Sequence, residues 1–181
     1  KHWEMWNEPP ETAVSWAGAI PTLVTMPQHA RAIIKSIDPN AVIVSPGTDK
    51  NTPTASYCNQ VLGVNCGSNW TAAYLAAGAK GYVDVIAFHG YTGANPENVI
   101  GVIQLQKAAM AASGVASLPL WDTEGSWGMN TQLTSLSRRA AFVARKFLIQ
   151  RSSGLSPLDW NSWCSTTIGP TSLSTSSLQP A

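Results

Sequence analysis

The sequence alternates five short runs rich in β-branched or aromatic residues with longer stretches of helical periodicity. This alternation is typical of parallel strands joined by crossover helices, because a parallel pair of strands needs a long connection. The pattern therefore predicts an α/β fold. The expected strands are residues 2–6, 41–45, 83–88, 117–123 and 158–163.

Four helices are expected between these strands, at residues 27–37, 71–81, 96–113 and 136–153. Pro27 suits a first helical turn, Asn95 is expected to cap the third helix before Pro96, and Gly114 and Gly154 end the last two helices. Residues 48–69 are polar and predict an excursion of the loop. The last helix is expected to pack through Leu136, Ala140, Val143 and Phe147, with the basic residues Arg138, Arg139, Arg145, Lys146 and Arg151 on its solvated side.

Five strands with four crossovers are too few to close a barrel of eight strands, which needs about 250 residues. The sheet is therefore either open or part of a barrel. Residues 1–164 carry the α/β pattern. Residues 165–181 are rich in Ser, Thr and Pro and are expected to form a loop.

The composition excludes several classes of function. The chain is 44% hydrophobic and 12% charged, with a net charge of +1, so it is expected to be globular and to lack a nucleic-acid surface. No apolar run approaches the roughly 18 to 20 residues that cross a bilayer, and no leader opens the chain. We therefore expect no membrane partner, and we interpret Lys1 as an internal residue of a longer protein.

The three cysteines allow one short-range disulfide. Cys58 and Cys66 bracket a short loop, while Cys164 stands apart. A disulfide between the first two and a set of three free thiols are given equal weight.

Polar residues gather where the expected strands end. Asn7 and Glu8 follow the first strand, His89 and Tyr91 the third, and Glu124 the fourth. The carboxyl ends of parallel strands form the edge at which α/β proteins bind their ligands. We therefore expect the functional site at this edge.

Glu8 and Glu124 are the two acidic residues of this edge. Two carboxylates about 5 to 5.5 Å apart are the catalytic groups of a retaining glycosidase, in which one attacks the anomeric carbon and the other protonates the leaving oxygen. If the sheet curves as a barrel does, these two residues face each other. The pair therefore predicts glycoside hydrolysis.

The end of the first strand needs an irregular backbone if Asn7 and Glu8 are both to reach a substrate. Neighbouring residues of a regular strand point to opposite faces, so the strand must bulge or end here. Pro9 and Pro10 favour an ending because neither has an amide hydrogen for a strand ladder. A capped loop, in which Asn7 and Glu8 only bind backbone donors, has equal weight from this segment alone.

Eight tryptophans are many for a chain of this length, and indole faces stack well on sugar rings. We expect sugar contacts from Trp127, Trp160 and Trp163, and places in the core or at interfaces for Trp3, Trp16 and Trp121. No paired histidine spacing supports a metal site, and no motif predicts a cofactor. A carbohydrate is therefore the expected partner.

Two segments resemble a known group of enzymes. The run WEMWNEP, residues 3–9, resembles the acid/base motif of clan A glycoside hydrolases, especially family 39, with family 5 as second choice. The run LPLWDTEGSWG, residues 118–128, resembles their nucleophile strand. The resemblance implies a partial TIM (β/α)8 barrel in which the five expected strands are barrel strands four to eight.

The resemblance also implies a role for each site residue. Glu8 matches the general acid/base, Asn7 its neighbouring amide and Glu124 the nucleophile. His89 and Tyr91 match a pair on strand six that lines the site and hydrogen-bonds the nucleophile, with the donor left open between them. Trp160 or Trp163 matches an aromatic residue of strand eight that lies beneath the sugar.

The preferred hypothesis is thus a retaining O-glycosyl hydrolase acting on β-glycosidic bonds, with β-xylosides or β-glucosides as substrates by resemblance. The alternative is a non-hydrolytic barrel remnant that only binds carbohydrate. Export from the cell is expected of an enzyme that meets polysaccharides. A chain limited to strands four to eight would expose sheet edges, so we expect it to aggregate or assemble when isolated.

Overall fold

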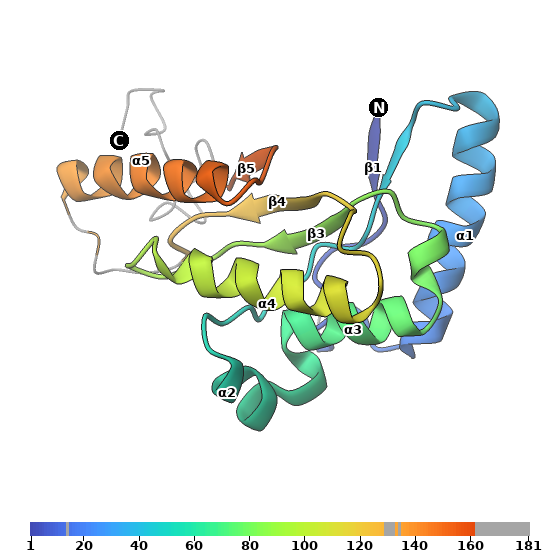
Figure 1. The fold of residues 1–181 in the computed structure, drawn as a ribbon, viewed down its shortest axis with the longest axis horizontal. Coiled ribbons are helices and arrows are strands. Elements are labelled where there is room, and N and C mark those ends of the chain that lie inside the picture. Colours follow the sequence, from blue (N-terminus) through green and yellow to red (C-terminus); the bar gives the residue numbers. More distant parts are fainter. Residues whose placement is uncertain (14, 129–132, 134, 162–181) are drawn as a thin grey trace.

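The structure, a computed structural model, describes residues 1–13, 15–128, 133 and 135–161 of the chain. It is an α/β fold whose five strands are all parallel, as the sequence pattern predicted (Figure 1). Each expected strand is present in shorter form. The strands are β1 (His2–Glu4), β2 (Val42–Val44), β3 (Ile86–His89), β4 (Leu120–Gly125) and β5 (Leu158–Trp160).

The strands lie side by side in the order of the sequence. β1 pairs with β2, with Trp3 opposite Ile43, and β3, β4 and β5 form a second ladder. Isolated bridges between Val44 and Val85 and between Thr48 and Phe88 connect β2 to β3. Because all pairs are parallel, the carboxyl ends of the five strands point the same way.

The main helices connect these strands and begin earlier than expected in two cases. They are α1 (Ile20–Ile37), α3 (Gly67–Ala76), α4 (Asn98–Ala112) and α5 (Leu136–Ser152). Pro27 lies inside α1 and not in its first turn, because Leu23 and Val24 extend the buried stripe toward the amino end. Asn95 does not cap α4, whose N-cap is Glu97. The described helices include none that combines the length and apolarity required to cross a bilayer.

The expected polar excursion contains short helical turns and a disulfide. The turns are α2 (Ala55–Tyr57), the π-helical η1 (Cys58–Leu62) and the 3₁₀ helix η2 (Gly63–Asn65). A further 3₁₀ helix, η3 (Ala79–Gly81), lies beyond the excursion, after α3. Cys58 and Cys66 are bonded to each other, which decides between the two readings of the cysteines. Cys164 lies outside the described residues.

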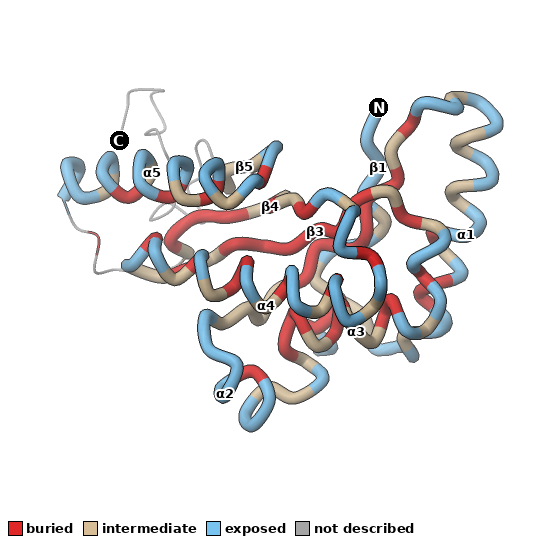
Figure 2. Tube along the Cα trace, in the orientation of Figure 1, coloured by how far each residue is buried: buried red, intermediate tan, exposed pale blue. Residues whose placement is uncertain are grey.

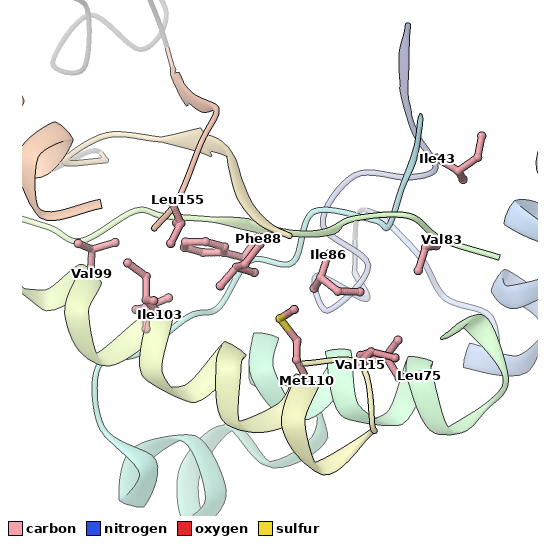
Figure 3. Close-up of a cluster of buried hydrophobic side chains, with 12 residues drawn as sticks. Ile43, Leu75, Val83, Ile86, Phe88, Val99, Ile103, Met110, Val115 and Leu155 are labelled. Carbon is pink, nitrogen blue, oxygen red and sulfur yellow. The ribbon is translucent and has the colours of Figure 1, made fainter. Parts of the chain in front are cut away.

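The largest hydrophobic cluster lies between the sheet and α4. Ile86 and Phe88 of β3 meet Val99, Ile103 and Met110 of α4, all at most 3% exposed (Figure 3). Figure 2 shows β3 buried along its length and β4 divided between buried and partly buried residues, whereas β1 is exposed. The core therefore fixes β3 and β4, whose ends carry His89 and Glu124.

A charged contact attaches α1 to the sheet. The Asp84 carboxylate lies 2.6 Å from Arg31 and 3.1 Å from Lys35, and it accepts a hydrogen bond from the backbone N–H of Ile43 at 3.0 Å. Partial burial works against ionisation of Asp84. The hydrogen bonds and positive charges outweigh it and hold the pKa of this carboxyl below its ordinary value.

The buried side of α5 differs from the expected stripe. Leu136 is 58% exposed and Phe147 38% exposed, while Phe142, Lys146 and Gln150 are buried. The expectation that Lys146 belongs to a solvated basic side is therefore wrong. The reason is a polar partner in the sheet, Asp122, which lies 3.3 Å from the Lys146 ammonium group.

The β1 edge of the sheet is exposed together with one side of α1. All three residues of β1 are exposed, and Trp3, expected in the core or at an interface, is 47% exposed and so lies outside the core. Ile33 and Ile37 of α1 are 62% and 81% exposed. An open strand edge beside apolar side chains favours pairing with another chain.

We predict that the isolated chain of residues 1–181 self-associates through this edge. Replacing Trp3, Ile33 and Ile37 by Lys should shift it toward monomer, because charged side chains on an edge oppose pairing. Sedimentation velocity over a concentration series measures the effect. The control is Val64→Lys, which changes an apolar residue that is 57% exposed on η2 and should leave assembly unchanged. A soluble wild-type monomer that unfolds cooperatively would contradict the prediction.

Candidate active site

Side chains from the ends of β1, β3, β4 and β5 meet at one edge of the sheet. Those of β1, β3 and β4 line a cleft of about 410 Å³, which Glu8 and Asn161 join through their bonds to His89 and Glu124. The cleft is lined by Glu4, Met5, Trp6, Asn7, His89, Thr123 and Glu124. The expected gathering of polar groups at the carboxyl ends of the strands is therefore found.

Glu8 owes its position to the way β1 ends. After β1, Asn7 forms an isolated bridge with Gly47, and the Glu8 N–H donates to the Gly47 carbonyl at 2.9 Å. Glu8 then takes a φ of 49°, in the left-handed region that residues with side chains rarely adopt. Pro9 and Pro10 follow and are buried. The strand thus ends at Glu8, and the carboxylate turns toward β3.

Glu4 supports the same end of β1 from within the strand. Its Oε1 accepts a hydrogen bond from the Gly47 N–H at 2.9 Å and lies 3.8 Å from Nε2 of His89. A Cβ at position 47 would collide with the His89 ring and the Glu4 carboxylate. Gly47 therefore allows the backbone after β2 to lie directly against these two side chains.

His89 lies among three carboxylates and is 2% exposed. Its Nδ1 is 2.8 Å from Oε1 of Glu8 and 3.9 Å from Oε2 of Glu124, while Nε2 faces Glu4. Burial alone would lower the pKa of His89. The hydrogen bonds to Glu4 and Glu8 and the charges of Glu8 and Glu124 outweigh burial and raise it to about 9. The ring is therefore positively charged at neutral pH.

Glu124 is held through one of its two oxygens. The Tyr91 hydroxyl donates to Oε1, and Asn161 Nδ2 donates to the same oxygen at 2.8 Å and to the Tyr91 hydroxyl oxygen at 2.6 Å. Burial and the neighbouring carboxylate raise the pKa of Tyr91, so its hydroxyl remains a donor. Of the two candidates for this contact, Tyr91 bonds Glu124 and His89 bonds Glu8.

One oxygen of Glu8, one oxygen of Glu124 and one ring nitrogen of His89 all lie within 4.8 Å of one another. Two carboxylates and an imidazole are also donors that a divalent cation accepts. Here Nδ1 of His89 is already bonded to Glu8, and the charged ring repels a cation. The arrangement therefore fits proton transfer better than metal binding.

Asp49 adds a fourth acidic group near this edge. Burial raises its pKa to about 7, and repulsion from Glu8 and Glu11 adds to the effect, while Lys50 opposes it. Lys50 itself lies 3.3 Å from Glu11 and donates to the Pro10 carbonyl at 3.2 Å. The loop after β2 thus places ionisable groups beside the segment that carries Glu8.

The tryptophans expected to contact sugar differ in their positions. Trp127 is 1% exposed and packs against Phe142 and Trp160 at ring distances of 5.5 and 5.1 Å, so its place is in the core. Trp160 is partly buried and precedes Asn161. Trp163 lies outside the described residues. Trp16, expected to pack, does so against Trp6 at 5.7 Å, and Trp121 packs on the cluster of Val44 and Ala87.

The structure adds Glu4 and Asn161 to the residues expected from the sequence. Glu4 carried a signal, since it is a charged residue inside a strand that is otherwise apolar and aromatic. Asn161 lies within the expected strand 158–163, between Trp160 and Ser162, where the tryptophans were the expected site residues. The position of Asn161, directly after the end of β5, is the signal that could have identified it.

Comparison with solved structures finds glycoside hydrolases. A family 128 (subgroup II) endo-β-1,3-glucanase from Sorangium cellulosum superposes with a TM-score of 0.67 at 18% identity, over 97% of this chain and 64% of that one. A family 128 (subgroup I) endo-β-1,3-glucanase from Amycolatopsis mediterranei, in complex with laminaripentaose, gives 0.67 at 19% identity, over 99% and 68%. A family 39 β-xylosidase from Caulobacter crescentus gives 0.64 at 22% identity, over 90% and 33%.

Because the sequence identities are low, these likenesses establish the fold alone. No protein-family model matches the sequence, and no curated protein matches it. Membership of family 39 is therefore not confirmed. The chain spans about two thirds of the length of the glucanases and about one third of that of the xylosidase.

The charge of His89 predicts a specific loss of stability at high pH. Because folding raises the pKa of His89 from 6.5 to about 9, the charged ring stabilises the fold fully below about pH 6.5. This contribution, about 3 kcal/mol, is lost as the pH rises through 9. Urea unfolding of the full-length protein at about pH 6 and about pH 10 measures it.

Two variants isolate the effect of His89 from other titrations. In His89→Gln, the free energy of unfolding should fall by about 3 kcal/mol less between the two pH values than in the wild type. His29→Gln, which changes an exposed histidine of α1, should behave as the wild type. Equal falls in wild type and His89→Gln would refute the assigned charge.

Proposed function

We propose that this chain forms strands four to eight of a (β/α)8 barrel and carries the catalytic residues of a retaining glycoside hydrolase. Glu8 is the general acid/base and Glu124 the nucleophile. The likeness to glycoside hydrolases supports the general activity, and the geometry of the site supports the residue roles. We extend the proposal to β-glucosides and β-xylosides, since the neighbours include a β-1,3-glucanase and a β-xylosidase.

The single observation that carries the proposal is the separation of the two carboxylates. An oxygen of Glu8 and an oxygen of Glu124 lie within 4.8 Å of each other. An inverting enzyme needs a water molecule between its carboxyl groups and separates them by about 6.5 to 9.5 Å, whereas about 5 to 5.5 Å is typical of retaining enzymes. The separation therefore favours direct attack by one carboxylate.

The hydrogen bonds of Glu124 favour its role as nucleophile. Tyr91 and Asn161 both donate to Oε1, which stabilises the carboxylate and leaves Oε2 on the side of Glu8 and His89. In the first step, Oε2 attacks the anomeric carbon and the bond to the leaving oxygen breaks. The leaving oxygen takes a proton from Glu8, and the sugar remains bonded to Glu124.

The second step returns the proton to the site. Water attacks the same carbon from the face that the leaving group vacated, while the Glu8 carboxylate accepts a proton from that water. The bond to Glu124 breaks and its carboxylate is restored. Two displacements at one carbon retain the β configuration.

His89 provides a source for the proton that Glu8 donates. The ring is charged at neutral pH and its Nδ1 lies 2.8 Å from Glu8, so this pair holds a proton up to about pH 9. As negative charge develops on the leaving oxygen, the proton moves from Nδ1 to Glu8 and from Glu8 to that oxygen. His89 then recovers its proton when Glu8 deprotonates the attacking water.

Asn7 is the substrate-binding residue that the described part of the chain supplies to this proposal. The exposed Asn7 lines the cleft beside Glu8, where its amide can bond a sugar hydroxyl. Trp160, at the end of β5, stacks on Phe147 and packs against Trp127, and it does not line the cleft, so its place is in packing. The Cys58–Cys66 disulfide supports export of the protein, because disulfides persist in oxidising compartments.

The proposed roles predict distinct defects in the full-length protein. Glu124→Gln should lower kcat by several orders of magnitude, because an amide is a poor nucleophile. Glu8→Ala should lower kcat by about 10²- to 10⁴-fold with poor leaving groups and much less with aryl glycosides, and azide should partly restore it by replacing water as nucleophile. Release of sugar from laminari- and xylo-oligosaccharides and from aryl β-glycosides measures these effects.

The control is Glu11→Gln, which removes a charge from the same loop as Glu8, at a carboxylate that pairs with Lys50. It should keep kcat within about twofold of the wild type. Full activity of Glu124→Gln or Glu8→Ala would refute the roles. Oligosaccharide binding without turnover by the wild type would favour a non-hydrolytic carbohydrate-binding protein instead.

A further inference from the structure

Three polar side chains lie buried beneath the active-site edge, and we call them the buried triad: Asp122 of β4 and Lys146 and Gln150 of α5. They are 0%, 0% and 1% exposed. The Lys146 ammonium lies 3.3 Å from Oδ2 of Asp122, and the Gln150 amide donates to the same oxygen. None of the three lines the cleft.

The buried triad binds both sides of one glycine of the site. The Gly90 N–H donates to Oδ1 of Asp122 at 2.8 Å, and Lys146 Nζ donates to the Gly90 carbonyl. Gly90 lies between His89 and Tyr91 in the sequence. His89 bonds Glu8 and Tyr91 bonds Glu124, so the two proposed catalytic groups receive their partners from either side of this residue.

The fit around the triad leaves no space for side chains at two backbone positions. A Cβ at Gly90 would collide with the Asp122 carboxylate, and a Cβ at Gly125 would collide with the Lys146 ammonium. Gly125 directly follows Glu124. The triad therefore touches the backbone beside His89 and Tyr91 on β3 and beside Glu124 on β4.

Backbone bonds extend this contact to a third strand. The Gly90 N–H also donates to the Glu124 carbonyl at 2.8 Å, and the Gly125 carbonyl accepts from the Asn161 N–H at 3.2 Å. Asn161 in turn holds Oε1 of Glu124. The regular strand register is interrupted at this level, between Phe88 and His89 and between Asp122 and Gly125.

A buried ion pair contributes little net stability to a core, because both charges lose their hydration. Burial raises the pKa of Asp122 and lowers that of Lys146, and each charge opposes the shift of the other. Apolar residues of similar volume often give equal or greater stability at such positions. The triad therefore calls for a reason beyond packing, and the irregular strand ends that it holds supply one.

We propose that Asp122, Lys146 and Gln150 are positioning residues, which hold the Gly90 peptide and thereby set Glu8–His89 against Glu124–Tyr91. This inference rests on the proposed glycosidase activity. A displacement of about 1 Å at a reacting group can cost about 10²-fold in rate. Loss of the triad should thus affect kcat far more than KM.

The test separates positioning from stability in the full-length protein with four forms: wild type, Lys146→Met, Asp122→Asn with Lys146→Met, and Arg145→Met. Lys146→Met leaves the buried Asp122 carboxylate without a positively charged partner and should lower both Tm and kcat. The double variant removes both charges, so Tm should recover relative to Lys146→Met. Arg145→Met removes the neighbouring cation of α5, whose partner Glu97 is exposed, and should match the wild type.

The double variant decides the inference. Positioning predicts that its kcat stays about 10²-fold below the wild type, with KM changed less than about threefold, even though Tm has recovered. A kcat that returns with Tm to within about threefold of the wild type would show that the triad acts through stability alone, and would overturn the inference.

Two further measurements keep the inference testable if activity or folding fails. If the wild type hydrolyses no β-glycoside, the proposed function fails, and hydrogen exchange of residues 88–92 then decides. Faster exchange there in the double variant, with Arg145→Met unchanged, supports positioning, and equal exchange overturns it.

If the double variant does not fold, Gln150→Met keeps both charges and should lower kcat about fivefold at constant KM. Wild-type kcat in that variant would overturn the inference.

Discussion

The site depends on a single positive charge among carboxylates. Glu8 and Glu124 approach within 4.8 Å, and Glu4 lies on the other side of the His89 ring. Carboxylates at such distances repel each other. The buried His89 ring reduces this repulsion, and its raised pKa expresses the same interaction from the side of the histidine. The proton that gives His89 its positive charge stabilises the two carboxylates. In the proposed reaction, the same proton can be passed to Glu8.

Two layers of contacts hold these groups in register. The upper layer consists of side-chain bonds, His89 to Glu8 and Tyr91 with Asn161 to Glu124. The lower layer is the buried triad, which bonds the backbone between His89 and Tyr91. Parallel strands pair regularly only until their ends, so the residues that follow need other partners. Here α5 supplies them, and a crossover helix thereby becomes part of the site.

Much of the fold and half of the site could be predicted from local patterns. β-Branched runs marked the strands, and Glu8, His89, Tyr91 and Glu124 stood where those runs end. Asn161 follows the fifth run in the same manner, whereas Lys146 could not be found from local patterns. The apolar stripe of α5 appeared to be Leu136 to Phe147, yet a buried lysine is stable only because Asp122 faces it from another strand. Such a partner, distant in sequence, is invisible to periodicity within one helix.

The described residues supply the groups of the proposed reaction more completely than the groups that would recognise the substrate. Every group to which we assign a step of the reaction, as nucleophile or in proton transfer, lies between Glu8 and Glu124, although the chain spans only part of the glycoside hydrolases that it resembles. Sugar recognition has fewer described groups, since Trp127 and Trp160 pack against each other and Asn7 remains. The described residues thus argue for a reaction type more strongly than for a particular sugar. Chemistry demands fixed distances within one rigid edge, whereas specificity is distributed over the whole wall of a cleft.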